Sequence, residues 1–215
     1  MAEPALYLKQ LELGPMQNFV YLVGDPATRE AVVVDPGWEV PRILQTLQAD
    51  GYHVTKVLVT HTHFDHVMGL EELLNAVDVP IYVHHTEATA LHVQPSSVKP
   101  LAGGETVLVG QVPMTIIHTP GHTPGSQCLL VHGRLLSGDT LFIRGCGRCD
   151  LPGGDPATMY ESLTKKLKPL DDATLLYPGH NYADAPSAPL REEKRANPFL
   201  SSPTLQDFLR LVGHG

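Results

Sequence analysis

A cluster of three histidines and one aspartate within six positions constrains this chain more than any other feature. Segment 61–66 reads HTHFDH and directly follows the run VTKVLVT at 54–60, whose β-branched residues are typical of a strand. On an extended segment, side chains two positions apart point the same way, so we expect His61 and His63 to share one ion. If a helix begins after His63, Asp65 and His66 face a neighbouring position. One short segment is therefore predicted to supply ligands to two adjacent metal ions.

Three further candidate ligands lie in glycine-containing turns that follow other predicted strands. His122 lies in TPGHTPG (119–125), Asp139 in SGDT (137–140) and His180 in YPGHNY (177–182). The edge of a sheet brings such strand ends together and holds them rigidly. Nitrogen and oxygen ligands without a thiolate suit Zn(II), Fe(II) or Mn(II), and two ions bridged by a carboxylate activate water at neutral pH. The remaining histidines are expected to be structural or exposed.

The apolar pattern predicts short strands that alternate with helices. Hydrophobic residues make up 42% of the 215 residues, which is enough for a core, and the 19 glycines and 19 prolines indicate many turns rather than a helical bundle. Helices are expected at 39–49, 69–77 and 155–167. This alternation indicates a layered α/β fold. We expect one domain over 1–215, with 186–215 forming a short C-terminal helical tail.

Charge and cysteine content exclude several classes of protein. With 15 basic and 23 acidic residues the net charge is −8, which disfavours nucleic-acid binding. No apolar run approaches the roughly 20 residues of a membrane span, and the N-terminus lacks the basic and apolar regions of a secretory signal. The three cysteines do not form a paired framework. We therefore expect a cytoplasmic protein without membrane or nucleic-acid partners.

The order of the candidate ligands resembles the metallo-β-lactamase superfamily. The signature at 61–66 is followed by His122, Asp139 and His180 over nearly the whole chain. This resemblance implies an α/β fold of the αββα type, a four-layer sandwich with the metals at one edge. It also implies a first site of His61, His63 and His122, a second site of Asp65, His66 and His180, and a bridging Asp139.

Within the superfamily, the chain most resembles the glyoxalase II group, the hydroxyacylglutathione hydrolases. The motifs that carry this similarity are GDTLF (138–142), GCGR (145–148), PGHNY (178–182) and NPFL (197–200). The resemblance implies cleavage of a thioester, S-D-lactoylglutathione or a related acyl-thiol, by a metal-bound hydroxide, with Asp65 and Asp139 as catalytic residues. It implies two divalent ions, Zn first and Fe or Mn as alternatives, and a monomer or homodimer. It assigns Arg148 and Tyr182 to the glutathione moiety, although no basic pair directly follows NPFL.

The same motifs also resemble the persulfide dioxygenases. That group carries the same seven ligands but uses one Fe(II), at positions that match His61, His122 and Asp139, to oxidise glutathione persulfide; two histidines and one carboxylate are typical of non-haem iron oxygenases. There GCGR is followed by TDF, whereas this chain has CDL at 149–151 and a PGG turn at 152–154. These differences favour the hydrolase. Lactone or β-lactam hydrolysis and a non-enzymatic metal protein are further alternatives.

Overall fold

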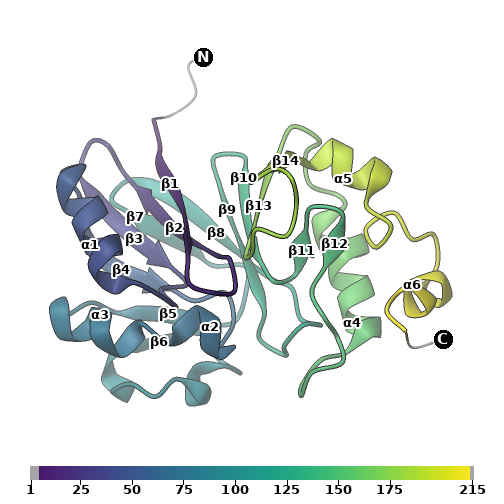
Figure 1. Cartoon of the computed structure of the whole chain (residues 1–215), viewed down its shortest axis with the longest axis horizontal. Helices are drawn as coiled ribbons and strands as arrows, with labels where there is room; N and C mark the ends of the chain where they lie inside the picture. The colour runs from purple at the N-terminus through teal and green to yellow at the C-terminus, as the bar shows by residue number, and fades with distance from the viewer. Residues whose placement is uncertain (1–4, 214–215) are drawn as a thin grey trace.

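The computed structural model describes residues 5–213, in which two six-stranded sheets pack face to face (Figure 1). The first sheet has the strand order β1-β2-β3-β4-β5-β6 and is formed by Tyr7–Leu13, Asn18–Gly24, Glu30–Val34, His53–Leu58, Ile81–His84 and Val98–Leu101. The second sheet has the order β14-β13-β10-β9-β8-β7. In chain order its strands are β7 Thr106–Val109, β8 Val112–His118, β9 Gln127–Val131, β10 Arg134–Gly138, β13 Leu175–Pro178 and β14 Ala188–Pro189. Two short strands, β11 Leu141–Phe142 and β12 Gly145–Cys146, pair as a separate antiparallel sheet.

Helices cover the outer face of each sheet, as Figure 1 shows. Beside the first sheet lie α1 Val40–Ala49, α2 Phe64–Val67, α3 Leu70–Ala76 and the 3₁₀ turns Ala88–Ala90 and Pro95–Ser97. Beside the second sheet lie α4 Pro156–Glu161, the π-helical segment Ser162–Leu167, α5 Leu190–Ala196 and α6 Leu205–Leu211. The layer order is thus helix, sheet, sheet, helix. The expected αββα sandwich is confirmed.

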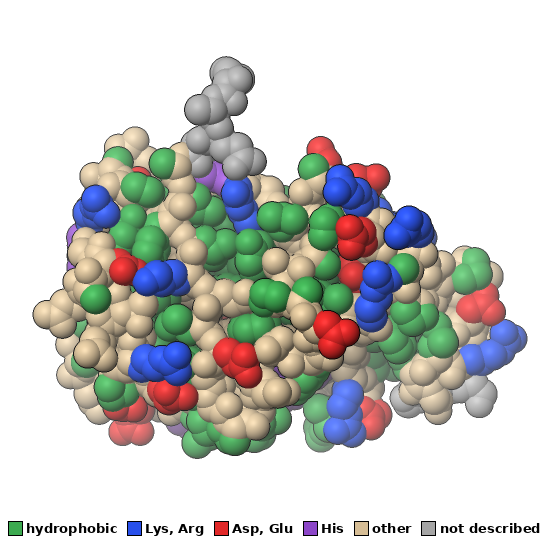
Figure 2. Space-filling model, turned by 45° about the horizontal axis from the view of Figure 1, so that its top comes forward, with side chains coloured by type: hydrophobic (Ala, Val, Ile, Leu, Met, Phe, Trp, Pro, Cys, Tyr) green, Lys and Arg blue, Asp and Glu red, His purple; other side chains and the backbone are tan. Residues whose placement is uncertain are grey.

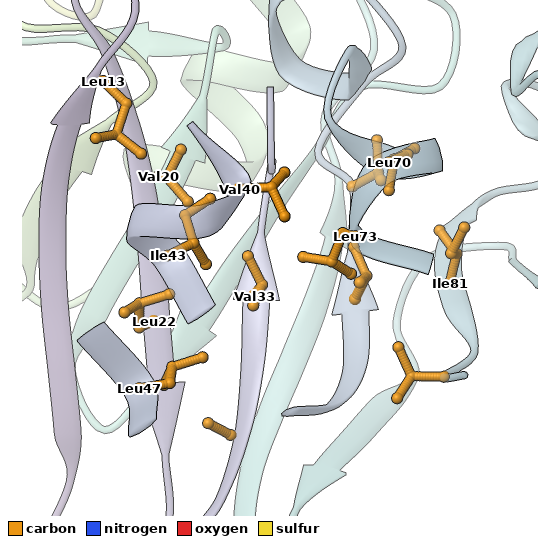
Figure 3. Packing of buried hydrophobic residues seen from close by; sticks show 14 of the residues in the cluster. Leu13, Val20, Leu22, Val33, Val40, Ile43, Leu47, Leu70, Leu73 and Ile81 are labelled. Carbon is orange, nitrogen blue, oxygen red and sulfur yellow. The ribbon is translucent and has the colours of Figure 1, made fainter. Parts of the chain in front are cut away.

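Strand β2 shows why these residues form a buried layer. Its side chains alternate between two apolar clusters, so every residue of the strand is buried. Val20 and Leu22 belong to the cluster beneath α1 and α3, where Ile43 and Leu47 pack (Figure 3). The residues between them, such as Tyr21, belong to the cluster between the two sheets. This double burial fixes the register of the first sheet, and with it the strand ends.

A third apolar cluster lies on the outer face of the second sheet. Leu135 of β10 and Leu176 of β13 pack there with Met159 and Leu163, and Phe208 of α6 is fully buried among them. The C-terminal segment carries two helices in the region where the sequence suggests a tail. Because α6 contributes one of the largest buried side chains, this segment is part of the core of the second half.

Two expectations about individual elements were wrong or incomplete. The predicted continuous helix at 155–167 changes to π-helical geometry at Ser162, where the Lys168 amide bonds the Leu163 carbonyl at 2.8 Å. The Ser162 hydroxyl donates to the Pro120 carbonyl at 2.7 Å and ties this turn to the loop before His122. Strand β1 was not predicted, because it is an edge strand of half-buried residues in which polar side chains hide the alternation.

Two structural observations concern membrane spans and the distribution of surface charge. No helix within residues 5–213 is long and apolar enough to cross a membrane. Acidic and basic side chains are interspersed on the face drawn in Figure 2, without a continuous basic stripe.

Candidate metal centre

The four predicted ligand segments meet at one edge of the two sheets. His61 follows β4, and His63 is the N-cap of α2, so Asp65 and His66 lie in the first helical turn, as the sequence predicted. His122 and Asp139 follow β8 and β10. His180 follows β13, and all of these ligands except His63 are fully or nearly buried. The centre is therefore built by both sheets.

The ligand atoms form two groups. His61, His63 and His122 place ring nitrogens within 4.8 Å of one another, and so do the ligand atoms of Asp65, His66 and His180. In the first group, His122 Nε2 lies 2.9 Å from His63 Nδ1. In the second group, His66 Nε2 lies 3.3 Å from His180 Nε2. The structure thus brings together both sets that the resemblance implies.

Asp139 lies between the two groups. Its Oδ2 is 3.7 Å from His122 Nε2 and 3.3 Å from His180 Nε2. Its Oδ1 is 3.5 Å from His66 Nε2. One carboxylate therefore faces ligands of both groups, which is the position that a bridging ligand needs.

Two buried atoms of this centre have no hydrogen-bond partner among the described residues. They are His61 Nε2 and Asp139 Oδ1. A buried polar atom without a partner costs about 1–3 kcal/mol and is rare in folded proteins. Both atoms point to a divalent cation as their missing partner, and the imidazole and carboxylate donor set fits such an ion.

Four histidines are anchored through the ring nitrogen that does not face the centre. This arrangement fixes the ring orientation and leaves Nε2 for an ion. The anchoring pairs of Nδ1 are His61 with Thr60 Oγ1 at 3.1 Å, His66 with Asp35 Oδ2 at 3.0 Å, His122 with the Arg148 carbonyl at 2.7 Å and His180 with the Met16 carbonyl at 2.9 Å.

Two supporting residues were missed by the sequence reasoning. Asp35 accepts hydrogen bonds from the Thr60 amide at 2.7 Å and the Thr60 hydroxyl at 2.6 Å, besides its contact with His66. Asn18 Nδ2 donates to Asp65 Oδ2 at 2.8 Å. Asp35 lies in a strand-end turn, DPG, that matches the pattern used for the ligands. Asn18 opens a strand and carries no such signal.

Burial and neighbouring charges set the protonation of the centre. Burial alone would lower the pKa of His66, but Asp139 and Asp35 hold it well above its ordinary value. Burial alone would raise the pKa of Asp139, but His66 and His180 hold it well below. Burial and the charge of His66 lower the pKa of His61. Anionic carboxylates and neutral imidazoles are the forms that bind a metal. Asp139 and His61 are held in those forms, whereas His66 must release a proton when an ion binds.

Glycines in the turns let the backbone approach the ligands. A Cβ added to Gly179 would lie 2.3 Å from Asp139 Oδ1. One added to Gly37 would lie 1.8 Å from the Asp65 carbonyl oxygen. No side chain fits at these distances, so the close approach requires glycine.

The two residues assigned to the substrate lie beside the centre in different ways. Tyr182 stacks on the His180 ring, with centroids 4.7 Å apart and planes 10° apart, and its side chain is exposed. The Arg148 carbonyl holds His122, but the exposed guanidinium pairs with both carboxylate oxygens of Asp150 at 2.9 and 2.8 Å. The ring of Tyr182 therefore borders the centre directly, whereas the Arg148 side chain already has an anionic partner.

Comparison with known proteins gives consistent matches. A family model described as the metallo-beta-lactamase superfamily matches residues 13–180. The mitochondrial persulfide dioxygenase ETHE1 of Homo sapiens is 32% identical over 203 residues, which cover 92% of this chain and 76% of the relative. A hydroxyacylglutathione hydrolase of Nitrosococcus oceani is 36% identical over 172 residues, which cover 78% of this chain and 64% of the relative.

A solved structure gives the same result at the level of the fold. The crystal structure of ETHE1 from Myxococcus xanthus superposes with a TM-score of 0.87 at 34% identity, covering 96% of this chain and 89% of that one. Hydrolase and dioxygenase relatives are thus similar to the chain at comparable identity. The ligand order, the two-sheet fold and the family match agree, and the chain belongs to the metallo-β-lactamase superfamily.

Proposed function

We propose that the protein is a metal-dependent hydrolase that cleaves a thioester, with S-D-lactoylglutathione or a related acyl-thiol as the substrate class. The observation that carries this proposal is the pair of ligand groups with Asp139 between them. This arrangement supports a centre of two divalent ions, with Zn(II) as the first candidate and Fe or Mn as alternatives.

The residues of the chain have separate roles in this reaction. Bound divalent ions supply an activated water at neutral pH and a Lewis acid for the carbonyl of the substrate. Asp139 holds the two ligand groups together through one carboxylate. Asp65, whose Oδ2 is held by Asn18, belongs to the second ligand group and orients the attacking water toward the carbonyl carbon. The leaving thiolate departs without a strong general acid, because thiol pKa values lie near 8.5.

A cavity reaches the border of the centre at Tyr182, which stacks on His180, and offers room for the thiol part of the substrate. It has a volume of about 410 Å³, and Tyr182, Arg144 and Ile143 are among the residues that line it. Phe142 packs edge-on against Tyr182 at 5.5 Å between centroids. We propose that Tyr182 donates a hydrogen bond to the substrate, and that Arg148 binds its carboxylate after exchanging partners with Asp150.

A persulfide dioxygenase is the second candidate function. The similarity to ETHE1 of two organisms favours it. In this case His61, His122 and Asp139 would hold one Fe(II), and the substrate would be glutathione persulfide.

Metal analysis combined with two assays separates the two functions. We expect two ions per chain and thioester cleavage that proceeds without oxygen. One iron per chain with oxygen consumption on addition of glutathione persulfide would instead select the dioxygenase. Absence of both activities in protein loaded with Zn, Fe or Mn would contradict both proposals.

We also propose a domain organisation, an oligomeric state and a location for the protein. We propose that residues 1–215 act as one domain, because the ligands come from both sheets, and that the protein is a monomer or homodimer. The thiols of Cys128, Cys146 and Cys149 are free, which fits a reducing compartment and supports the proposed cytoplasmic location.

A further inference from the structure

One buried carboxylate outside the ligand set connects two of the ligand loops. Glu87 follows β5 and is 5% exposed. Its Oε2 accepts hydrogen bonds from the Thr62 amide at 3.0 Å and from the Thr62 hydroxyl. Its Oε1 accepts from the Gly125 amide at 2.9 Å. Thr62 separates His61 from His63, and Gly125 lies in the turn of His122, so Glu87 joins the two loops of the three-histidine group.

The donors around Glu87 compensate for its burial. A carboxylate removed from water is destabilising unless hydrogen bonds satisfy its oxygens, and bonds to a charged acceptor are stronger than neutral ones. Burial alone would raise the pKa of Glu87, but hydrogen bonds from Thr62, Thr123 and Gly125 hold it below the ordinary value. The carboxylate is therefore an anion that draws amide and hydroxyl donors from both loops toward one point.

The packing leaves this connection little freedom. A Cβ added to Gly125 would lie 2.3 Å from Glu87 Cγ and 2.5 Å from Thr86 Oγ1. By contrast, the second ligand group is held by other residues, with Asn18 on Asp65, Asp35 on His66 and the Met16 carbonyl on His180. Asp35 also reaches His61 through the Thr60 hydroxyl, whereas the printed bonds of Glu87 go to the two loops of the three-histidine group.

We propose that Glu87 is a positioning residue for the three-histidine group, which sets the separation between the His61–His63 loop and the His122 turn. The inference rests on the proposed metal centre and holds for either candidate reaction. Glutamine at this position keeps the shape of the side chain but replaces one carboxylate oxygen with an NH2 group. That donor would face another donor, the backbone amide of Thr62 or of Gly125. One of the two loops then loses its acceptor.

The test compares metal binding by E87Q, H63A and the wild-type protein. Protein stripped of metal is titrated with Co(II) against a chelating competitor, and the ligand-field absorption is recorded for each binding step. His63 belongs to the three-histidine group alone, so H63A identifies the step of that group. We expect E87Q to weaken the same step by about 10–100-fold, the usual effect of losing a supporting residue, and to change its absorption spectrum.

A matched control comes from a second buried glutamate. Glu193 of α5 is fully buried, accepts from the Arg144 amide at 2.7 Å and does not contact the ligand loops. We expect E193Q to leave both binding steps within about 3-fold of wild type, even if it lowers the melting temperature as much as E87Q does. Such a result separates positioning from a general loss of stability. If E87Q does not fold, T62V, which removes only the hydroxyl donor, is expected to weaken the same step less strongly.

The inference is overturned if E87Q or T62V leaves the H63A-sensitive step unchanged, or weakens the other step equally. Binding of a single ion by the wild-type protein contradicts the two-ion hydrolase but still decides the role of Glu87. His122 is a ligand in both candidate centres, so E87Q must then weaken the one step that H122A removes. Absence of any Co(II) binding contradicts the metal centre and the inference together.

Discussion

The seven candidate ligands differ in how strongly the rest of the centre depends on each. The Asp139 carboxylate contacts both groups, and its Oδ1 is a buried acceptor without a hydrogen-bond partner within the described part of the chain. His63, in contrast, belongs to one group only. Single-residue changes are therefore expected to separate effects on one ion from effects on the whole centre.

Substitution of Asp139 by alanine removes the shared ligand. We expect D139A to bind at most one ion per chain and to lose more than about 100-fold in thioester turnover, a larger effect than loss of a supporting residue. Metal content and the rate of thioester cleavage are measured together. D78A, which changes an exposed aspartate of the same charge, is expected to retain both. Full turnover and metal content in D139A would contradict its bridging role.

At the scale of elements, the strand ends and the turns after them build the centre. β4, β8, β10 and β13 each end just before a ligand. β10 and β13 are adjacent and parallel, so their carboxyl ends lie at the same edge. The turn after β13 passes so close to Asp139 that the Gly179 amide bonds the Gly138 carbonyl at 2.8 Å. The choice of residue in this turn is therefore as restricted as the choice of the ligands themselves.

Alanine at Gly179 tests this restriction. The added Cβ would meet Asp139 Oδ1 at 2.3 Å, so we expect G179A to displace the carboxylate and lower metal affinity at least 10-fold. The measurement is metal retention during dialysis against a chelator. G145A is the control, since its Cβ would have ordinary contacts of 3.5 Å or more. Equal metal retention in both variants would show that the turn adapts.

At the scale of the whole molecule, each half of the sandwich contributes ligands and has its own outer cluster. His61 and Asp65 come from the half covered by α1 and α3, whereas His122 and His180 come from the half covered by α4 to α6. The centre therefore spans the interface between the halves. We therefore expect that destabilising either outer helical layer weakens metal binding, and that metal binding stabilises both halves.

The C-terminal helix α6 offers a test of the second half. Phe208 is fully buried and contacts Tyr160 and Phe199. We expect F208A to lower the free energy of unfolding by about 3–5 kcal/mol, measured by urea denaturation. L205A changes an exposed leucine of the same helix and is expected to cost less than about 1 kcal/mol. Similar values for both would mean that α6 is not part of the core.

Removal of metal is expected to destabilise the whole protein. An ion that binds only the folded state at 100 times its dissociation constant stabilises it by about 2.7 kcal/mol, which corresponds to a melting temperature higher by roughly 5–10 °C for a chain of this size. Thermal melts before chelation, after chelation and after return of Zn(II) measure the effect. A melting temperature that is unchanged throughout would argue against a metal bridging the two halves.

The sequence by itself indicated the candidate ligands and the class of fold. The HTHFDH segment after an apolar strand and the three glycine turns after later strands identify all seven candidate ligands, because metal chemistry and strand periodicity are both local properties of the chain. The alternating strands and helices likewise indicated a layered α/β architecture.

Only the tertiary structure decided which residues support the ligands and how the halves join. Asn18, Asp35 and Glu87 bond a ligand or a residue next to one, 25 or more positions away in the chain, and such pairs depend on how the sheets align rather than on local pattern. The π-helical segment at Ser162 was hidden for the same reason, since the loop before His122 holds it, whereas β1 was hidden by the polar side chains of an edge strand. Local sequence specifies the donors, and long-range packing specifies the geometry in which they meet.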